Sequence, residues 1–418
     1  MNNRILNFFV SIYPYSFVLF AFSIPISYRI SLYALGFITL IGALLIAYKK
    51  NLDHVFKSKI SIVLIFFWVL HLLSLFYTSN ISYGFSDVFQ KISLLIIPIV
   101  FIPDYINKNS YLLIKKAFIS GLILSSLYFI VRAIVLSTVF TPVGIFFKPN
   151  PVGVPWENFF FYDLFVKPHH PTYYSMYLTL GISILLNSIR ERSIFIKRWP
   201  IYLLTIYFIG IIFLTSSKAG ILTTFVVLII SLFGLLKSKG KLILLSTLII
   251  FIFFGIYFIN QNSRFATTIK NLKEFNFKTE VKDELAKKDL SRLEIWKSIP
   301  NVFVGNEWIF GVGVGDIKVR LKEAYRSTNA LYPYQEELNT HNQFLQTLVG
   351  IGLIGFIALI IILGYSTYIA LKSKDMIFIS FIIIVFMNFM FEAVLERVFG
   401  VLYLAFFLIV FANNSIKE

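Results

Sequence analysis

The sequence predicts an all-α protein that crosses a membrane many times. Of its 418 residues, 58% are hydrophobic and only 14% are charged, with a mean hydropathy of +0.80, which is outside the usual balance of soluble globular proteins. Apolar runs recur from end to end, most of them near the roughly 20 residues that a helix needs to cross the hydrocarbon core. The run 242–259 lacks the alternation of a membrane barrel strand, and helices satisfy their own backbone hydrogen bonds in lipid. We therefore expect a bundle of about 12 transmembrane helices.

The apolar runs place these helices in order along the chain. The expected spans are residues 8–26, 30–47, 60–77, 92–102, 111–139, 173–189, 200–214, 219–236, 242–259, 344–371, 376–391 and 398–412. Only Arg4 precedes the first run, without a small-residue cleavage site, so we expect that span to be retained rather than removed as a signal peptide. The fourth run is short and contains Pro98, which predicts a broken or incomplete helix.

Basic residues mark alternate connections between the spans. They follow the second, fourth, sixth, eighth and tenth spans, at Lys49, Lys50, Lys57, Lys59, Lys108, Lys115, Lys116, Arg190, Arg192, Lys197, Arg198, Lys237, Lys239, Lys241, Lys372 and Lys374. Because positive residues resist translocation, these loops and both termini are expected in the cytoplasm. The net charge of +17 then reflects topology, and without a basic stripe interleaved with aromatic residues we expect no nucleic-acid partner.

The other connections face the opposite side, and two of them, residues 140–172 and 260–342, are long. The second is too long for a simple connector, and its Lys and Glu residues within 261–290 are spaced as on an exposed helix. We divide the chain into spans one to nine (1–259), a largely helical exterior loop domain (260–341) and spans ten to twelve (342–418). The chain has no cysteine, which excludes disulfides and thiolate metal sites.

Polar residues gather at the exterior ends of the spans, most densely at residues 339–343 (NTHNQ) before a long apolar run. We expect Asn339 or Thr340 to cap the helix that begins here. The positive helix end favours a neutral His341 imidazole that can accept a proton. A general base and a plain capping or interfacial cluster both explain this segment.

Within the spans, His71 and Arg132 stand out as ionisable residues. A charge at bilayer depth costs roughly 2.5 to 3.5 kcal/mol on insertion scales. We expect His71 to be a hydrogen-bonded packing residue rather than a proton relay, and Arg132, near the exterior end of its span, to reach the interface. With so few ionisable residues, the pattern disfavours a polysaccharide flippase or transporter, which stays a more distant alternative.

Several short motifs follow one another in a characteristic order. They are residues 214–220 (LTSSKAG), residues 291–296 (SRLEIW), the glycines at 311, 313 and 315, residues 341–346 (HNQFLQ), and the glycines at 350, 352 and 355. This ordered set resembles the signature region of O-antigen ligases and related polymerases, although the family usually has arginine where this chain has Lys218. With the twelve-span layout and the large loop between spans nine and ten, the resemblance covers most of the chain.

The resemblance implies an enzyme of the bacterial inner membrane with its active site on the periplasmic side. It implies metal-independent, inverting transfer of a glycan from undecaprenyl diphosphate to an acceptor hydroxyl, usually on lipid A-core in ligases, without a cofactor. Membrane lipids would surround it. An O-antigen or exopolysaccharide polymerase of the same superfamily would take another lipid-linked glycan as acceptor, and the residues around His341 do not separate the two.

The resemblance also suggests roles for individual residues. His341 would take the acceptor proton as the hydroxyl attacks the anomeric carbon. Arg292 and Lys218 would bind the diphosphate, since arginine offers a planar fork to phosphate oxygens and lysine a mobile point charge. A salt bridge with Asp289 or Glu294 would also explain Arg292, and an interfacial position would also explain Lys218.

Other polar residues are candidates for lining the substrate site. They are His169, His170, Tyr173, Asn342 and Arg264. Adjacent histidines cannot easily chelate one ion, and no carboxylate cluster accompanies them, so no metal site is expected.

Three further features have structural interpretations. The glycines at 311, 313 and 315 lack the strand-to-helix context of a nucleotide loop, and those at 350, 352 and 355 should permit close packing or bending. Glu392, Glu396 and Arg397 resemble a family feature at the last exterior turn, although a local ion-pair cluster explains them as well.

Overall fold

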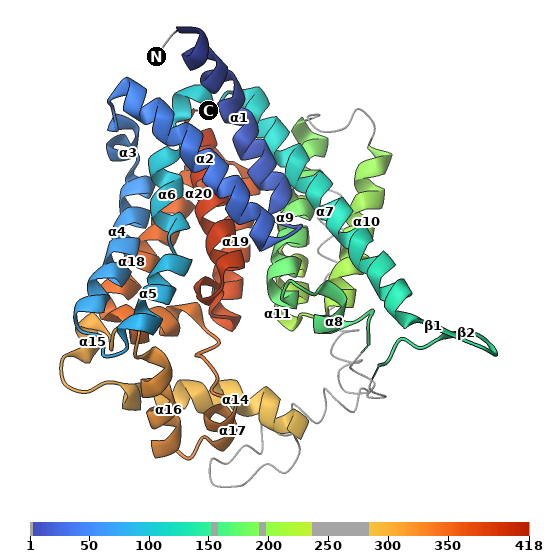
Figure 1. Cartoon of the computed structure of the whole chain (residues 1–418), viewed down its shortest axis with the longest axis vertical. Coiled ribbons are helices and arrows are strands. Elements are labelled where there is room, and N and C mark those ends of the chain that lie inside the picture. The colour runs from blue at the N-terminus through green and yellow to red at the C-terminus, as the bar shows by residue number, and fades with distance from the viewer. Residues whose placement is uncertain (1–2, 152–157, 192–197, 236–283, 418) are drawn as a thin grey trace.

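The computed structural model consists almost entirely of helices (Figure 1). It describes residues 3–151, 158–191, 198–235 and 284–417. Within these ranges, seven helical segments are long and apolar enough to cross a membrane, and three shorter apolar helices accompany them. The expected all-α membrane fold is therefore confirmed, while the total number of spans stays a prediction. The expected ninth span, 242–259, lies outside the described residues.

Largely apolar helices form the body of the molecule. They are α1 (Asn3–Ser23), α2 (Tyr28–Lys49), α4 (Lys59–Leu73), α5 (Ile81–Gln90), α6 (Ser93–Val100), α7 (Lys108–Ser137), α9 (Pro171–Glu191), α10 (Trp199–Thr215), α11 (Lys218–Leu235), α18 (Gln343–Ser373), α19 (Met376–Phe391) and α20 (Val398–Lys417). The other elements connect or cover them. These are α3 (Asp53–Lys57), β1 (Thr138–Thr141), β2 (Gly144–Phe147), α8 (Tyr162–Val166), α14 (Glu284–Ser298), α15 (Glu307–Phe310), α16 (Ile317–Ser327) and α17 (Leu331–Gln335).

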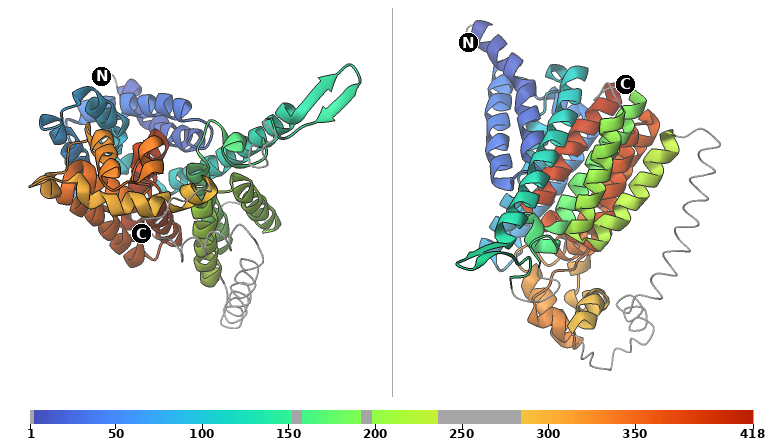
Figure 2. Two further views of the ribbon diagram at one scale, coloured as in Figure 1. Left: turned by 90° about the horizontal axis from the view of Figure 1, so that it is seen from below. Right: turned by 90° about the vertical axis from the view of Figure 1, so that its right-hand side faces the viewer.

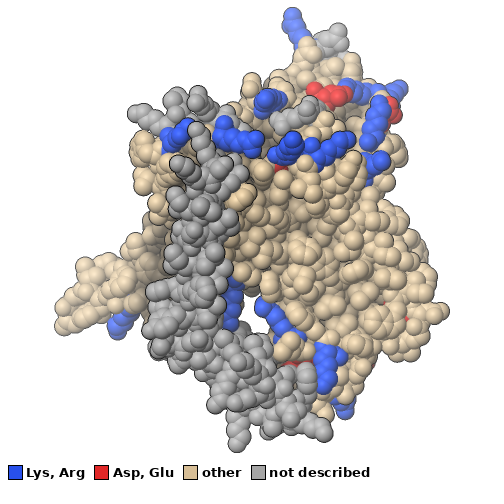
Figure 3. Space-filling model, turned by 180° about the vertical axis from the view of Figure 1, so that it is seen from behind, with Lys and Arg blue, Asp and Glu red and all other residues tan. Residues whose placement is uncertain are grey.

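The two ends of the helical bundle differ. Both termini lie at one end, and α14–α17 gather at the other, which we call the distal end (Figures 1 and 2). A band of Lys and Arg side chains crosses the molecule near the termini, followed by a broad belt that is almost free of charge (Figure 3). This is the distribution that the positive-inside rule predicts for a cytoplasmic end. The cytoplasmic placement of the termini nevertheless stays a prediction.

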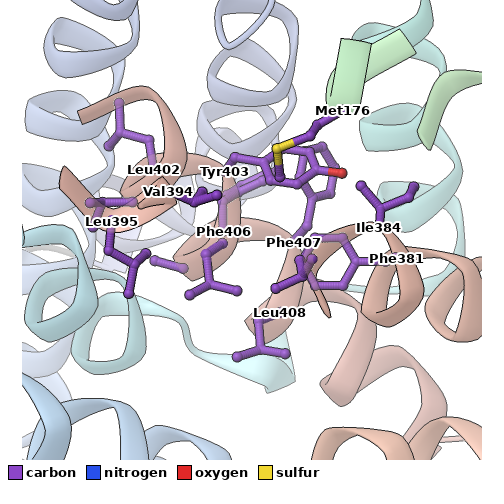
Figure 4. Close-up of a cluster of buried hydrophobic side chains, with 14 of the residues drawn as sticks. Met176, Phe381, Ile384, Val394, Leu395, Leu402, Tyr403, Phe406, Phe407 and Leu408 are labelled. Atoms are coloured by element: carbon purple, nitrogen blue, oxygen red, sulfur yellow. The ribbon is translucent and has the colours of Figure 1, made fainter. Parts of the chain in front are cut away.

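The core centres on α20. In this helix 78% of the candidate span is buried, against 33% in α1, because α20 is surrounded by other helices while α1 keeps an open apolar face. Tyr403, Phe407 and Phe411 of α20 pack their rings around Phe381 of α19, with centroid distances of 5.4 to 6.2 Å. Figure 4 shows part of this cluster. Burial of large aromatic surfaces holds the central helices together.

The fourth span begins earlier than the sequence suggested. We expected residues 92–102, but the structure joins α5 and α6 into one candidate span, Ile81–Val100. The expectation was wrong because Asp87 and Lys91 interrupt the apolar run. Their side chains form an ion pair inside the bundle, where Lys91 is 1% exposed. At this depth, the free energy needed to bury two opposite charges that pair with each other is much lower than that needed to bury a single unpaired charge.

A sharp bend divides α18. Ile351 and Gly352 leave helical geometry, and Gly352 has φ +66° and ψ −165°, a conformation accessible to glycine but strained for other residues. The expected bending near the glycines at 350, 352 and 355 is confirmed. Because the helical ladder is interrupted, backbone carbonyls before the bend can accept hydrogen bonds from another segment.

The glycine run at 311–315 lies against this bend. The N–H groups of Val312 and Gly313 donate to the carbonyls of Val349 and Gly350 at 2.8 and 3.1 Å. A Cβ atom on Gly311 would lie 2.4 Å from the Gly350 oxygen, so a side chain cannot fit there. The glycines therefore allow two backbones to meet, and they attach the segment that carries α14–α17 to α18.

A second attachment joins α14–α17 to the turn between α4 and α5. The Asp316 carboxylate accepts the backbone N–H groups of Ser79 and Asn80 at 2.6 and 2.9 Å. The Tyr77 hydroxyl donates to the Phe310 carbonyl at 2.5 Å. Two separate sets of bonds thus fix α14–α17 over the distal end of the bundle.

Candidate functional site

His341 lies at the distal end, immediately before α18. Its φ of +44° is uncommon for a residue other than glycine. The Asn339 side chain accepts the His341 N–H at 2.9 Å, and Asn342 caps α18 by accepting the Leu345 N–H at 3.1 Å. The expectation that Asn339 or Thr340 caps this helix was wrong, because Asn342 has the extended backbone that brings its side chain to the first helical turn.

The segment around His341 is held by three helices. Trp296 of α14 donates its indole N–H to the Thr340 carbonyl at 3.0 Å. The Thr340 hydroxyl lies 2.9 Å from the Gln346 side-chain oxygen in α18. The Asn342 amide donates to the Met390 carbonyl in α19 at 3.3 Å. These bonds support the unusual backbone of His341, as a strained conformation requires.

The His341 ring faces a carboxylate. Its Nδ1 atom lies 3.5 Å from Glu392 Oε2, within ion-pair range but longer than a strong hydrogen bond. Nδ1 is inaccessible to solvent, although the side chain as a whole is 26% exposed. The accessible part of the ring therefore lies away from Glu392. A carboxylate at Nδ1 orients an imidazole and stabilises its charged form, which leaves Nε2 for proton exchange.

Glu392 follows α19 directly and is largely buried, with 15% of its side chain exposed. Burial opposes ionisation, but contact with His341 and the charges of His170 and Arg292 outweigh it and lower the pKa of Glu392 below its ordinary value. Opposite charges favour the ionised carboxylate. Glu392 thus interacts electrostatically with His341, His170 and Arg292, which come from three other segments of the chain.

Arg292 belongs to α14. It lies one turn before Trp296, which contacts the segment before His341. Burial raises the pKa of Tyr162, and the Arg292 charge partly opposes that shift. The Arg292 charge therefore acts on Tyr162 of α8 and on Glu392 at the end of α19.

The structure also bears on the alternative interpretation of Arg292 as part of a surface salt bridge. Among the side chains described, no ion pair joins Arg292 to Glu294. Burial raises the pKa of Glu294, whereas a close guanidinium would lower it. The Asp289 side chain lies outside the described part of the chain.

The adjacent histidines have different environments. His169 is 1% exposed, and its Nε2 lies 3.2 Å from the Ile26 carbonyl in the turn between α1 and α2. Burial lowers the pKa of His169 to about 4. Burial also lowers the pKa of His170, while the Glu392 carboxylate opposes that shift. His170 is therefore subject to the charge of Glu392, whereas His169 is a packing residue.

Lys218 and Tyr173 also lie at the distal end. Lys218 is the first residue of α11, and Tyr173 is in the first turn of α9. These helix ends meet, since a Cβ atom on Gly220 would lie 2.2 Å from the Ser175 hydroxyl. Tyr173 is 2% exposed, and its ring centroid is 5.6 Å from that of His170. The role of Lys218 beside Arg292 stays a prediction, and Arg264 lies outside the described residues.

A second ionic group lies deeper, behind the first turn of α18. His71, Asp87, Lys91 and Glu396 line a small cavity together with polar side chains of α18. His71 Nδ1 lies 2.9 Å from the Phe67 carbonyl, so the expected hydrogen-bonded histidine is found. Across the described ranges, no three His, Asp or Glu residues are arranged to hold a metal ion.

The fold and site define a class of protein: a helical membrane protein with a histidine–carboxylate pair at one end of the bundle, the end that also carries Arg292 and Lys218. Residues 203–360 match the family model described as O-antigen ligase. The resemblance to the O-antigen ligase superfamily is thereby confirmed over this region, which carries Lys218, Arg292 and His341. His170 and Glu392 lie outside it. Among curated proteins, none matches the chain.

Proposed function

We propose that this protein is a glycosyltransferase that moves a glycan from undecaprenyl diphosphate to an acceptor hydroxyl. The proposal places the reaction at the periplasmic face of a bacterial inner membrane, with lipid A-core as the acceptor. The observation that supports it most directly is the pairing of His341 Nδ1 with Glu392 at 3.5 Å. His341 and Arg292 lie in the region that matches the O-antigen ligase family model, and Glu392 lies beyond its end.

In the proposed reaction, His341 acts as the general base through Nε2. It removes the acceptor proton as the hydroxyl oxygen forms a bond to the anomeric carbon of the donor glycan. The bond from that carbon to the diphosphate oxygen breaks on the opposite face, and its electron pair leaves with the diphosphate. A single displacement of this kind inverts the anomeric configuration. Glu392 stabilises the imidazolium that results.

The leaving diphosphate gains negative charge as the glycosidic bond breaks. Arg292 and Lys218 are proposed to bind its oxygens, and a cation aimed at developing charge lowers the barrier. Arg292 also acts on Glu392, so the same cation would favour an ionised partner for His341. No metal or cofactor is needed in this scheme, because the donor already carries its leaving group.

Gene deletion followed by analysis of surface glycolipid and carrier-bound glycan tests the proposal. A ligase predicts full-length carrier-bound chains together with bare lipid A-core. Single repeat units on the core would instead indicate a polymerase. Glycan that stays on the cytoplasmic side would indicate a transporter, and an unchanged profile would exclude all three.

A transfer assay with the purified protein tests the chemistry. We expect His341→Ala to abolish transfer while donor binding is retained. His54→Gln is the matched control, since His54 lies in α3 near the terminal end of the bundle and contacts the Ile99 carbonyl. Substantial turnover by purified His341→Ala would contradict the assignment.

A further inference from the structure

The strands β1 and β2 form a hairpin that extends α7 sideways from the distal end (Figures 1 and 2). The strands are antiparallel, with Thr138 opposite Phe147 and Thr141 opposite Gly144. They form the only sheet within the described ranges, and this sheet has two strands. An isolated hairpin is marginally stable at best in water, so its surroundings should contribute to its stability.

Apolar side chains cover both faces of this hairpin. Phe140 is 77% exposed, Val143 86%, Ile145 70% and Phe147 60%. Because neighbouring side chains on a strand point to opposite faces, Phe140 and Val139 expose apolar surface on different sides. A protein partner with a flat surface would cover one face and leave the other open, whereas a fluid apolar environment covers both.

The hairpin continues the lipid-facing side of α7. Tyr128, Val131 and Val135 are 57%, 57% and 63% exposed within a candidate membrane span. Between Arg132 and Lys148 the sequence contains no charged residue. Arg132 does not interrupt this surface, because its guanidinium turns to donate to the Leu164 carbonyl at 2.8 Å. The apolar surface therefore runs without a break from the helix into the hairpin.

We infer that the hairpin is a lipid-binding surface that lies in the membrane interface at the distal end, with the lipids of that leaflet as its partner. Its depth follows from its backbone. A two-stranded ribbon has two open edges, and unpaired N–H and C=O groups are not tolerated in the hydrocarbon centre. At the interface, water can satisfy these edges while the apolar side chains enter the acyl boundary. Lys148 can then reach lipid phosphates from the end of the hairpin.

This surface is attached to the segment that leads to the candidate site. The rings of Phe147 and Phe160 lie 5.9 Å apart, and the Phe159 N–H donates to the Pro149 carbonyl at 2.9 Å. The same segment continues through α8, which Arg132 holds, to His170. A hairpin anchored in lipid would therefore fix the height of this segment relative to the membrane. The inference stands independently of the proposed reaction.

The chain contains no cysteine, so a single introduced cysteine can be spin-labelled without first replacing native cysteines. We would label Val143→Cys in the full chain, reconstitute it in phospholipid nanodiscs, and compare collision rates with oxygen and with a water-soluble nickel complex. Val131→Cys on α7 serves as the lipid control. Val319→Cys on α16, which is 52% exposed in the exterior segment, serves as the aqueous control.

The ratio of oxygen to nickel accessibility should be several-fold higher at Val143 than at Val319, and lower than at Val131, as expected for interfacial depth. A ratio at Val143 equal to that at Val319 would overturn the inference. Spin–spin broadening that disappears on dilution with unlabelled chain would show that a second copy covers the hairpin, and would also overturn it. The same measurement at Ile145→Cys covers the case in which Val143→Cys fails to fold.

Discussion

The ammonium group of Lys91 lies 3.5 Å from a carboxylate oxygen of Glu396, deep inside the helical bundle. The same ammonium group also pairs with Asp87. Glu396 belongs to the short segment that joins α19 to α20, and Glu392 begins this connection. The pair with Lys91 therefore anchors the connection that brings Glu392 to His341.

Replacing Lys91 with methionine should destabilise the protein strongly. The change leaves two carboxylates in the interior without a cation, and breaking a buried ion pair in this way costs about 3 to 5 kcal/mol. Thermal unfolding in detergent measures the effect. Lys318→Met is the matched control, since Lys318 pairs with Glu337 on an exposed surface, where an ion pair contributes about 1 kcal/mol or less. Similar losses in both variants would contradict a special role for the interior pair.

Substitution of Glu392 by glutamine should reduce turnover rather than donor binding. Glutamine keeps the size of the side chain but cannot stabilise an imidazolium on His341. We expect the transfer rate to fall about a hundredfold or more, in the range that acid–base contributions cover. Single-turnover rates and donor affinity of purified protein, measured separately, distinguish the two effects.

Glu336→Gln is the control for that experiment, because Glu336 is exposed beyond α17. Its turnover should equal that of the wild type. Equal loss of donor affinity and rate in Glu392→Gln would instead indicate that Glu392 contributes to binding.

Much of the fold could be predicted from the sequence because lipid constrains it so strongly. Long apolar runs must be helical, and the expected spans at α2, α4, α10 and α19 follow directly from this requirement. The beginning of α5 was missed because a hydropathy pattern cannot show that Asp87 and Lys91 neutralise each other. The expected fifth span, 111–139, also ran into β1, since the apolar composition continues beyond the end of α7 at Ser137.

The site was only partly predictable for a similar reason. His341 and Arg292 stand in recognisable motifs, and local pattern was enough to single them out. Their relation to Glu392 depends on the packing of α14, α18 and α19, which no local pattern contains. The sequence also could not predict that His169 and His170 have different environments. The difference depends on which of the two rings faces the turn between α1 and α2.

Alanine at Gly352 should disturb the attachment of α14–α17 to α18. Gly352 has φ +66°, and a Cβ atom there would lie 2.2 Å from the Ile309 carbonyl oxygen. We expect a loss of stability of about 1 to 3 kcal/mol, typical of a strained backbone position. Faster limited proteolysis between α14 and α17 would report the loosened contact.

Gly364→Ala in the same helix is the matched control. A Cβ atom at Gly364 meets nothing within 4 Å, so alanine should leave stability unchanged or raise it by up to about 1 kcal/mol through helix propensity. If both variants behave alike, the close approach at Gly352 is not what holds the segment.

His169 should make stability depend on pH. Its pKa is about 4 in the folded protein, against an ordinary value of 6.5, so the unfolded chain binds more protons between these values. The stability associated with neutral His169 is therefore complete above about pH 6.5 and is lost progressively as the pH falls through about 4. His169→Phe keeps the ring among its aromatic neighbours and removes this titration. The slope of the unfolding temperature between pH 6.5 and 4 should be smaller in the variant, and identical slopes would contradict the assignment.

Lys218 provides the sharpest test of the diphosphate proposal, because the resemblance places arginine at this position. Lys218→Met removes the charge, and we expect the KM for the lipid-linked donor to rise and kcat to fall, by about 10 to 100-fold in kcat/KM for a few kcal/mol of lost contact. Lys218→Arg should retain activity or increase it, since a guanidinium can contact two phosphate oxygens. Lys116→Met, near the terminal end of α7, controls for the loss of a positive charge and should leave kcat/KM unchanged. If methionine and arginine at position 218 both match the wild type, Lys218 does not contact the donor, and Arg292 must act without it.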